Sequence, residues 1–288
     1  MQTSEEETVY QGSRGLDFKE MIVGLLRKGK LKSKYIDLLT NDQNMREYDK
    51  AFTAASANQD SNYEIYEQIG DLTANKFIVW YTYKRFPQLN CPLGVKVVAR
   101  IRINYGARQS FAQIGENLGF WPFISASDDD RGRKKKDLLE DCVESFIGVT
   151  EYIIDSAFRP GVGYGIVYDI LSSIFDDIEI SLKYEDLYDP KTRLKELFDA
   201  FPNLGTWAYV DTRDDLLATS SIYLVPPNAP KPAKQNNNPN RNWVLLGTGK
   251  AAKKADAQQR AAEIGLQALN NKGYVKAVPD EYKTFCKY

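Results

Sequence analysis

The segment Asn62-Tyr-Glu64-Ile-Tyr-Glu67-Gln-Ile-Gly70-Asp71 carries the strongest structural signal in this 288-residue chain. Apolar residues recur around it at spacings of three and four, which predicts a helix over 63–85. On that helix Glu64, Glu67 and Asp71 share one face. These acids repel one another, and no lysine or arginine lies among them in the sequence to offset the charge.

A second segment, Asp137-Leu-Leu-Glu140-Asp141-Cys-Val-Glu144-Ser-Phe-Ile-Gly148, repeats this arrangement. Asp141 and Glu144 lie three residues apart and precede apolar residues that would bury the helix. Uncompensated carboxylates beside an apolar face suit a hard divalent cation, because Mg²⁺ takes oxygen ligands and bridges carboxylates to phosphate oxygens. The alternative is that each acid belongs to an ordinary solvated helix face.

The composition limits the chemistry open to the chain. It contains no histidine, which excludes serine–histidine triads, histidine–zinc hydrolysis and histidine acid–base catalysis. Its three cysteines are widely spaced, which excludes a disulfide framework and a zinc ribbon. The acidic, polar N-terminus and the absence of a long apolar run predict an intracellular protein, cytoplasmic or nuclear, that is neither secreted nor held in a membrane.

The pattern along the chain predicts two domains with short additions at each end. Residues 1–17 are expected to form a flexible extension, and 18–188 a helical domain interrupted by the charged block 128–136. The expected helices of this domain are Asp17–Arg27, Met45–Ala57, Tyr63–Arg85, Gly94–Tyr105, Ser110–Leu118, Lys136–Ser156 and Val162–Ile178.

From 189 to 272 the expected order changes to α-β-β-β-α, and 273–288 is left as a C-terminal tail. Asp189 and Pro190 are typical of a helix start. The third expected strand, Trp243–Leu246, is followed by a turn at Gly247 and Gly249 and then by the last helix, Ala252–Asn271.

The two acidic segments resemble the two signature motifs of the ribonuclease III family, and the similarity extends over roughly residues 35–178. Gln68 departs from the pattern, since the family usually has an apolar or aromatic residue of the subunit contact there. By position, the family's metal-binding and catalytic acids correspond to Glu67, Asp71, Asp141 and Glu144, and a further signature acid corresponds to Glu64.

Residues 189–272 resemble a double-stranded-RNA-binding domain. This segment holds about 12 basic and 8 acidic residues, a net charge near +4, so the rest of the chain is near −5 given the total of −1. Such a charge difference is typical of an RNA-binding module beside an acidic catalytic domain. The resemblance implies RNA contacts at Thr192, Lys195, Glu196, Lys250, Lys253 and Lys254.

The resemblance therefore implies a mostly α protein, with an all-helical ribonuclease III endonuclease domain followed by a small α-β-β-β-α double-stranded-RNA-binding domain. It implies a homodimer through the catalytic domain and Mg²⁺-dependent hydrolysis of double-stranded RNA, with Mn²⁺ able to substitute, leaving 5′-phosphate and 3′-hydroxyl ends. The spacing and extensions are closer to the enzymes of large DNA viruses than to the short bacterial ones.

Two questions stay open at the level of sequence. The first is whether the protein cuts RNA or only binds it, since a non-catalytic protein that sequesters double-stranded RNA would need only the C-terminal module. The run Arg131-Gly-Arg-Lys-Lys-Lys136 could contact phosphate beside the acids, or it could be a solvated loop balanced by the acids 128–130.

Overall fold

The computed structural model describes residues 8–106, 108–214, 216–230 and 239–285. The chain divides into two compact units, 1–180 and 181–288, and each has its own buried core. In the first unit the elements are β1 (Val9–Tyr10), α1 (Leu16–Lys28), α2 (Ser33–Leu39), α3 (Asp42–Ala51), α4 (Glu64–Arg85), α5 (Gly94–Tyr105), α6 (Arg108–Asn117), β2 (Ala126–Ser127), α7 (Asp128–Arg133), α8 (Lys135–Ala157) and α9 (Val162–Phe175). In the second they are α10 (Tyr184–Leu187), α11 (Pro190–Ala200), β3 (Thr206–Arg213), β4 (Ala218–Val225), β5 (Val244–Ala251), α12 (Lys254–Asn270) and α13 (Asp280–Phe285).

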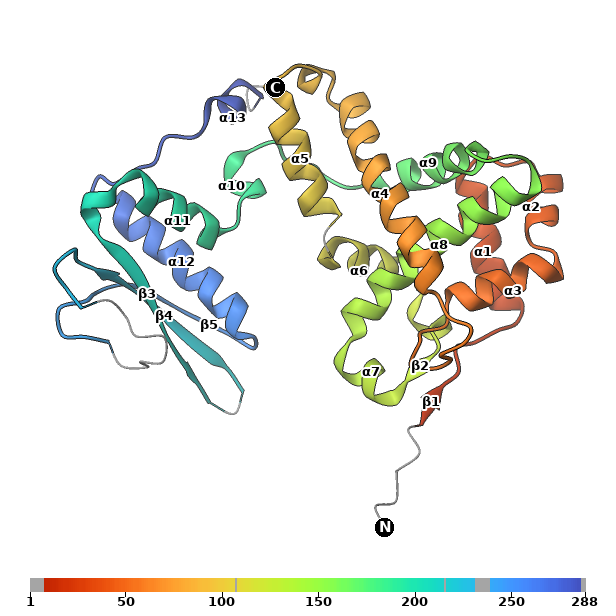
Figure 1. The fold of residues 1–288 in the computed structure, drawn as a ribbon, viewed down its shortest axis with the longest axis horizontal. Coiled ribbons are helices and arrows are strands. Elements are labelled where there is room, and N and C mark those ends of the chain that lie inside the picture. Colours follow the sequence, from red (N-terminus) through yellow and green to blue (C-terminus); the bar gives the residue numbers. More distant parts are fainter. Residues whose placement is uncertain (1–7, 107, 215, 231–238, 286–288) are drawn as a thin grey trace, which may run out of the picture. The chain divides into compact units, whose positions relative to one another are not determined.

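Helix α8 is the centre of the first unit (Figure 1). Its middle, from Cys142 to Thr150, is buried on every side, so this helix is a core element and not a surface one. Helices α3, α4, α6 and α9 pack around it. The mostly helical fold expected from the sequence is therefore what the structure contains.

The backbones of α4 and α8 touch where two glycines meet. A Cβ atom on Gly70 would lie 1.7 Å from the Glu144 carbonyl oxygen, and one on Gly148 would lie 1.9 Å from the Tyr66 carbonyl oxygen. No larger residue fits at either position without separating the helices. The close crossing brings the two acidic segments together.

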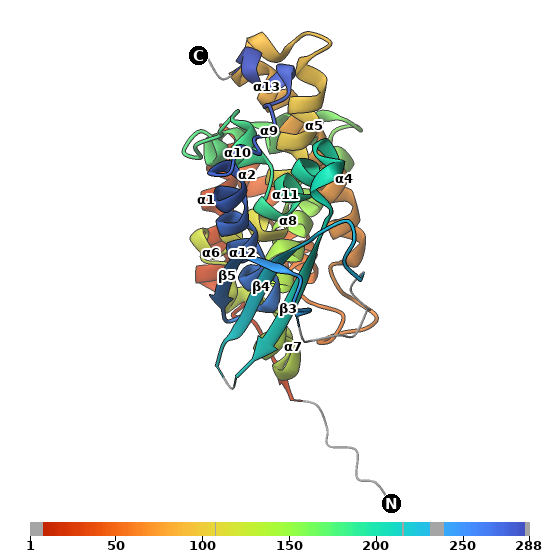
Figure 2. The ribbon, with the colours of Figure 1, turned by 90° about the vertical axis from the view of Figure 1, so that its left-hand side faces the viewer.

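The second unit is a three-stranded antiparallel sheet of order β3-β4-β5, with α11 and α12 on one face (Figures 1 and 2). Leu194, Phe198, Ile222, Leu246 and Leu269 form the core between the helices and the sheet. The Asp189 side chain accepts a hydrogen bond from the Thr192 amide and so caps α11. This is the α-β-β-β-α order expected from the sequence.

The third strand is longer than predicted. Gly247 and Gly249 were expected in a turn, but both lie within β5. A Cβ on Gly249 would be 2.2 Å from the Ala257 carbonyl oxygen, and one on Gly247 would be 2.8 Å from the Ile264 side chain. The glycines thus let α12 lie directly on the strand, which is a packing role and not a turn.

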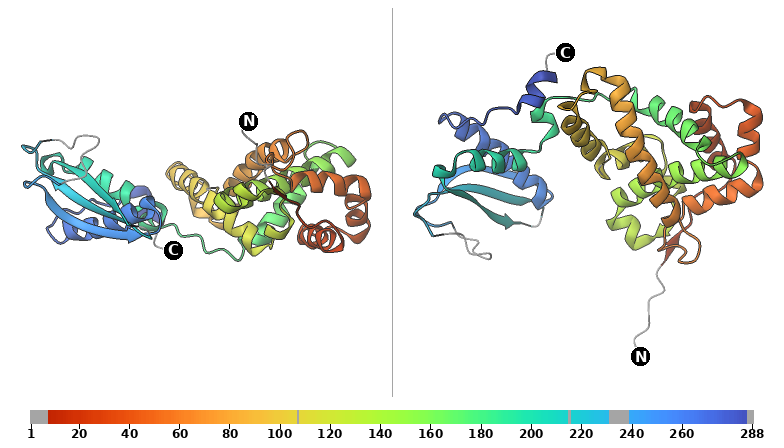
Figure 3. Two further views of the ribbon diagram at one scale, coloured as in Figure 1. Left: turned by 90° about the horizontal axis from the view of Figure 1, so that it is seen from below. Right: turned by 45° about the horizontal axis from the view of Figure 1, so that its top comes forward.

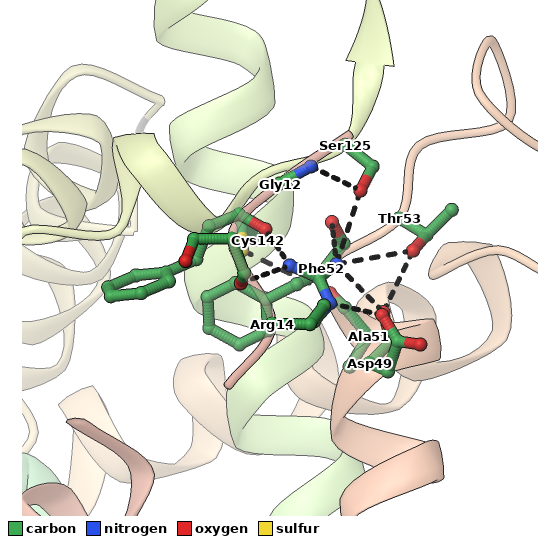
Figure 4. Close-up of polar contacts among 10 residues, drawn as sticks. Gly12, Arg14, Asp49, Ala51, Phe52, Thr53, Ser125 and Cys142 are labelled. Atoms are coloured by element: carbon green, nitrogen blue, oxygen red, sulfur yellow. Dashed lines mark hydrogen bonds and ion pairs between the residues drawn. The ribbon is translucent and has the colours of Figure 1, made fainter. Parts of the chain in front are cut away.

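The N-terminal residues that are described are attached to the first unit, where the sequence predicted a flexible extension through residue 17. Strand β1 pairs with β2, and α1 already begins at Leu16. Arg14 donates to the carbonyl oxygens of Phe52 and Phe123 and forms an ion pair with Asp49 (Figure 4). The Arg14 guanidinium donates hydrogen bonds to several carbonyl oxygens at once, which explains why this polar segment is held in place.

Two further local predictions were wrong. The helix expected at Met45–Ala57 ends at Ala51, and the chain then pairs through a bridge between Thr53 and Ser125. The charged block expected to break the helices instead contains α7. Its three acids occupy the first turn and its two arginines the last, which suits the helix dipole, and the Ser127 hydroxyl caps it.

The units divide between Ile180 and Ser181, ahead of the boundary placed at 188 from the sequence. The reason is a tyrosine cluster: the Tyr184 ring lies 4.8 Å from that of Tyr188 and 5.6 Å from that of Tyr282. Tyr282 lies on α13, so residues assigned to a tail also pack onto the second unit. Among the described residues, no helix combines the length and apolar character needed to cross a membrane.

Candidate functional site

The acids of α4 and α8 meet beside the crossing of these two helices, which belong to the helical unit whose ribbon Figure 3 shows in two further views. A cleft of about 720 Å³ is lined by Glu64, Glu67, Asp71 and Glu144, together with Lys50 and Gln68. Asp141 does not line this cleft, although it is close enough to Glu67 to affect its ionisation. The structure therefore brings four of the five predicted acids into one hollow and keeps the fifth at its edge.

Two of the acids are strongly perturbed. Burial, followed by repulsion from Asp141 and Glu64, raises the pKa of Glu67 to about 7. Burial, followed by repulsion from Asp71 and Glu140, raises the pKa of Glu144 to about 8. Glu144 is only 6% exposed. These carboxylates oppose one another's ionisation, which is the electrostatic signature of a site that receives positive charge.

Asp71 and Asp141 are each fixed by a neighbour. The Asn75 side-chain amide donates to Asp71 Oδ1 over 2.7 Å and is itself held by Arg102, whose guanidinium donates to Asn75 Oδ1 over 3.2 Å. The Tyr63 hydroxyl donates to Asp141 Oδ2 over 2.8 Å. Burial, and then the Asp141 charge, place the pKa of Tyr63 far above its usual range, so the hydroxyl remains a donor.

Sequence reasoning missed Tyr63, Asn75 and Lys50. Tyr63 stands immediately before α4 and has the sequence pattern of a core aromatic residue, and its partner lies 78 residues away on α8. Lys50 comes from α3 and enters the cleft from outside the acidic segments, with its Nζ 5.2 Å from the centre of the Tyr66 ring. Only Asn75 carried a local signal, because it lies one helical turn after Asp71.

The donor set fits a hard divalent cation. Every side-chain ligand available at the crossing is a carboxylate or amide oxygen, and Mg²⁺ is bound by such oxygens together with water. Within the described residues, however, no three acids converge closely enough to form a ready-made metal cage. The site resembles the Mg²⁺ pattern in which one or two carboxylates and a substrate phosphate complete the shell.

The basic run before α8 is mostly used within the fold. The Arg131 guanidinium lies between the Tyr10 and Trp121 rings, at 3.8 and 3.9 Å from their centres, and donates to the Ile124 carbonyl oxygen. Arg133 and Lys134 pair with acids one turn earlier in α7. The structure thus assigns Arg131 a structural role.

In the second unit, the predicted RNA-contacting residues fall into two groups. Lys195, Lys250 and Lys253 are exposed. The other three are engaged within the unit: Thr192 donates to Asp189, Glu196 pairs with Lys276, and Lys254, although it is also exposed, pairs with Asp211 at 2.8 Å. The N-terminus of α12, at Lys253, has no side-chain cap.

The similarity to known proteins agrees with this geometry. The chain is 42% identical over 291 residues to a ribonuclease 3 of Invertebrate iridescent virus 6, covering 96% of both chains. It is 36% identical over 262 residues to a ribonuclease 3 of Frog virus 3, covering 90% of this chain and 65% of the other, and 26% identical to the ribonuclease 3 of Desulfotalea psychrophila, covering 89% and 99%. The chain therefore belongs to the ribonuclease III family of nucleases.

No protein-family model matches the chain. Among solved structures, the nuclease domain of ribonuclease III from Campylobacter jejuni covers 59% of this chain and 100% of that domain, at 18% identity and a TM-score of 0.44. The match to Dicer from Pichia stipitis covers 79% of this chain and 94% of the Dicer chain, at 18% identity and a TM-score of 0.35. The family assignment rests on the sequence similarity.

Proposed function

We propose that the protein is an endoribonuclease that hydrolyses phosphodiester bonds of double-stranded RNA with Mg²⁺, or with Mn²⁺ in its place, leaving 5′-phosphate and 3′-hydroxyl ends. The observation that carries this proposal is the acid-lined cleft at the crossing of α4 and α8, in a member of a ribonuclease family. RNA processing is the process it would serve.

Glu67, Asp71, Asp141 and Glu144 would hold the cation, with Glu64 at the rim of the cleft. A divalent cation supplies a Lewis acid at the phosphate and lowers the pKa of its water. The chain's own residues orient the acids, since Tyr63 fixes Asp141 and Asn75 fixes Asp71. The open cleft leaves room for the RNA backbone.

The second unit would bind the duplex through Lys250, near the end of β5, and Lys253, at the uncapped start of α12. Exposed amide N–H groups and lysines at a helix N-terminus favour phosphate, and such contacts position an RNA without reading its sequence. Thr192, Lys195, Glu196 and Lys254 remain candidates from the family resemblance. Of these, Lys195 alone is both exposed and without a hydrogen bond or ion pair to the described residues.

A second copy of the chain would pack on the outer face of α4. Ile65 and Leu72 are 61% and 69% exposed there, and Gln68 lies between them. Burying these side chains would gain apolar contact area next to the cleft, and two clefts in a homodimer could cut both strands of a duplex. Leu72→Glu should convert a dimer to a monomer in analytical ultracentrifugation, and a dimer that persists would contradict this contact.

The test of the catalytic proposal is incubation of a long duplex RNA with Mg²⁺, comparing the wild type with Glu144→Gln. We expect cleavage by the wild type and a loss of at least about 100-fold in the variant, as for removal of a metal-site group. Glu116→Gln is the matched control, because it removes a surface acid of the same unit outside the cleft. Binding without cleavage by the wild type would favour a protein that only sequesters RNA.

A further inference from the structure

A groove between α4 and α9 lies apart from the acidic cleft. It consists of two adjoining hollows of about 470 and 450 Å³ that share Lys84 and Tyr168. One is lined by Lys76, Trp80 and Tyr164, and the other extends along α9 to Ser172. The groove is therefore elongated, and its lining comes from two helices of the same unit, α4 and α9. Figure 1 labels both helices.

The groove presents an aromatic face and a net positive charge, because Lys76, Lys84 and Arg85 outnumber the acid in its lining, Asp176. Trp80 is 53% exposed, although a tryptophan usually buries most of its ring. Lys76 Nζ lies 3.7 Å from the centre of the Tyr164 ring, and Lys84 Nζ lies 4.4 Å from that of Tyr168. In the described part of the chain neither lysine pairs with an acid, so both charges are available to a ligand.

Two hydroxyls in the groove have unmet hydrogen-bonding capacity. Tyr164 Oη and Ser172 Oγ are buried, and neither has a partner within the described residues. Such groups are costly to leave unpaired. Both residues line the groove, so a small shift of either side chain would present its hydroxyl to a ligand that brings its own polar groups.

Helical geometry separates this groove from the catalytic face. Trp80 lies nine residues beyond Asp71, which at 100° per residue turns it about half a revolution and carries it about 14 Å along the axis. A ligand in the groove would therefore not compete for the acids. It would lie about one to three turns beyond Leu72, past the proposed subunit contact.

We propose that this groove binds single-stranded RNA, with a base stacked on Trp80 and flanking phosphates at Lys76 and Lys84. Unpaired nucleic acid is a flexible chain of flat rings and negative charges, and proteins bind it by combining aromatic platforms with a basic groove. The groove would hold unpaired nucleotides next to a duplex, which deepens the proposed function without depending on cleavage.

The first experiment measures binding of a labelled 12-nucleotide single-stranded RNA to the full chain without divalent cation, in the presence of excess unlabelled duplex RNA to occupy the duplex-binding surface. Trp80→Ala should weaken this binding by about 5- to 100-fold, the range for loss of one stacked base. Lys76→Ala/Lys84→Ala should lower the slope of log affinity against log salt by about 1.4, since each phosphate contact on a single strand contributes about 0.7.

Lys28→Ala/Lys34→Ala is the matched control for charge. Both lysines are exposed on the same unit, and Lys34 also lies over a tyrosine ring, but no exposed tryptophan stands beside them. The control should leave binding of the single strand unchanged. If both double variants lose the same affinity for the single strand, the loss is due to the change in net charge and not to the groove, and the proposal is overturned.

A second variant blocks the groove without removing any contact. Gly165 faces open space within it, so Gly165→Leu should fill the first hollow and weaken binding at least about 5-fold. Gly24→Leu makes the same change at an exposed α1 glycine that also faces open space, and it should have no effect. Both changes replace a helical glycine with a better helix former, so the fold should persist.

Cleavage of a blunt duplex should be unchanged in Trp80→Ala, so a failure of the proposed catalysis would not affect the binding result. Unchanged binding of the single strand by Trp80→Ala would overturn the proposal. So would conversion of a dimer to a monomer by this variant, because the groove would then be a subunit contact. Preferential binding of an acidic, aromatic peptide over RNA, lost in the same variants, would assign the groove to a protein partner and also overturn it.

Discussion

Among single residues, Tyr63 has the most direct influence on the acids, because its hydroxyl holds Asp141 at 2.8 Å. Tyr63→Phe removes one oxygen and leaves the 6%-exposed ring in place. We expect the half-saturating Mg²⁺ concentration for cleavage to rise about 10-fold, in line with the loss of a residue that orients a metal ligand. Cleavage at saturating Mg²⁺ should recover most of the wild-type rate.

Tyr48→Phe is the control for this change, since Tyr48 is a buried tyrosine whose hydroxyl contacts Thr150 and no acid of the site. If both variants shift the Mg²⁺ dependence equally, the effect belongs to the core and not to Asp141.

Glu144 makes the metal-free protein less stable at neutral pH. Its pKa is about 8 in the folded protein, against 4.5 for an ordinary glutamate. The folded state therefore binds the proton more tightly than the unfolded state, and stability falls as pH rises from about 5 to 8. Glu144→Gln removes this penalty, so at pH 8 in a chelator it should be more stable than the wild type by roughly 1–3 kcal/mol.

Thermal unfolding at pH 5 and pH 8 checks this prediction. The two proteins should converge at pH 5, where the wild-type carboxyl is protonated in the fold. Added Mg²⁺ at pH 8 should stabilise the wild type more than the variant. A variant that is less stable at pH 8 would show that Glu144 is held by favourable contacts instead.

At the scale of elements, the crossing of α4 and α8 depends on two glycines whose position no periodicity marks. Gly70→Ala would place a methyl group against the Glu144 carbonyl, and neither rigid helix can yield without separating the acids. We expect a loss of about 2–4 kcal/mol in the free energy of unfolding, measured with urea, and loss of cleavage. Gly24→Ala, at an open helical position, should be neutral or slightly stabilising, and a tolerated Gly70→Ala would contradict the close crossing.

The helices of the first unit could largely be predicted because their apolar spacing is a local property. The helix Gly94–Tyr105 was predicted with the bounds it has, α4 starts one residue later than expected, and α8 is one residue longer at each end. The acids on those helices could be named for the same reason, with the family resemblance giving their pairing. In contrast, α7 was not predicted, because a helix that is stabilised by charges at its ends has no apolar stripe in its sequence.

What the sequence could not provide depends on contacts between distant segments. The attachment of Arg14 to Phe52 and Phe123 joins residues 38 and 109 positions apart, and the contact of Tyr63 with Asp141 spans 78. No local pattern encodes such pairs. Likewise, Gly247 and Gly249 suggest a turn in isolation, and only the approach of α12 to β5 explains them.

At the scale of the whole molecule, the two units should contribute separately to cleavage. The second unit should determine the affinity for duplex RNA, and the first unit the rate of the chemical step. Lys250→Ala/Lys253→Ala removes two exposed cations, one from the end of β5 and one from the start of α12, far in sequence from every acid of the cleft. The slope of log affinity for duplex RNA against log salt should fall by about 1.8, using the B-DNA value of about 0.9 per phosphate contact. The KM for duplex cleavage should rise accordingly, while kcat at saturating RNA stays within about twofold of the wild-type value. A contact that is equally strong in the bound substrate and in the transition state does not change the barrier from the bound complex.

Lys28→Ala/Lys34→Ala removes the same charge from the first unit and should leave both the salt slope and KM near the wild-type values. Single-turnover cleavage at saturating RNA isolates the chemical step. A large fall in that rate for Lys250→Ala/Lys253→Ala would mean that the second unit also positions the scissile phosphate, since only an interaction strengthened in the transition state lowers kcat when it is lost. An unchanged salt slope would instead place the phosphate contacts elsewhere on the unit, with exposed Lys195 on α11 the next residue to test.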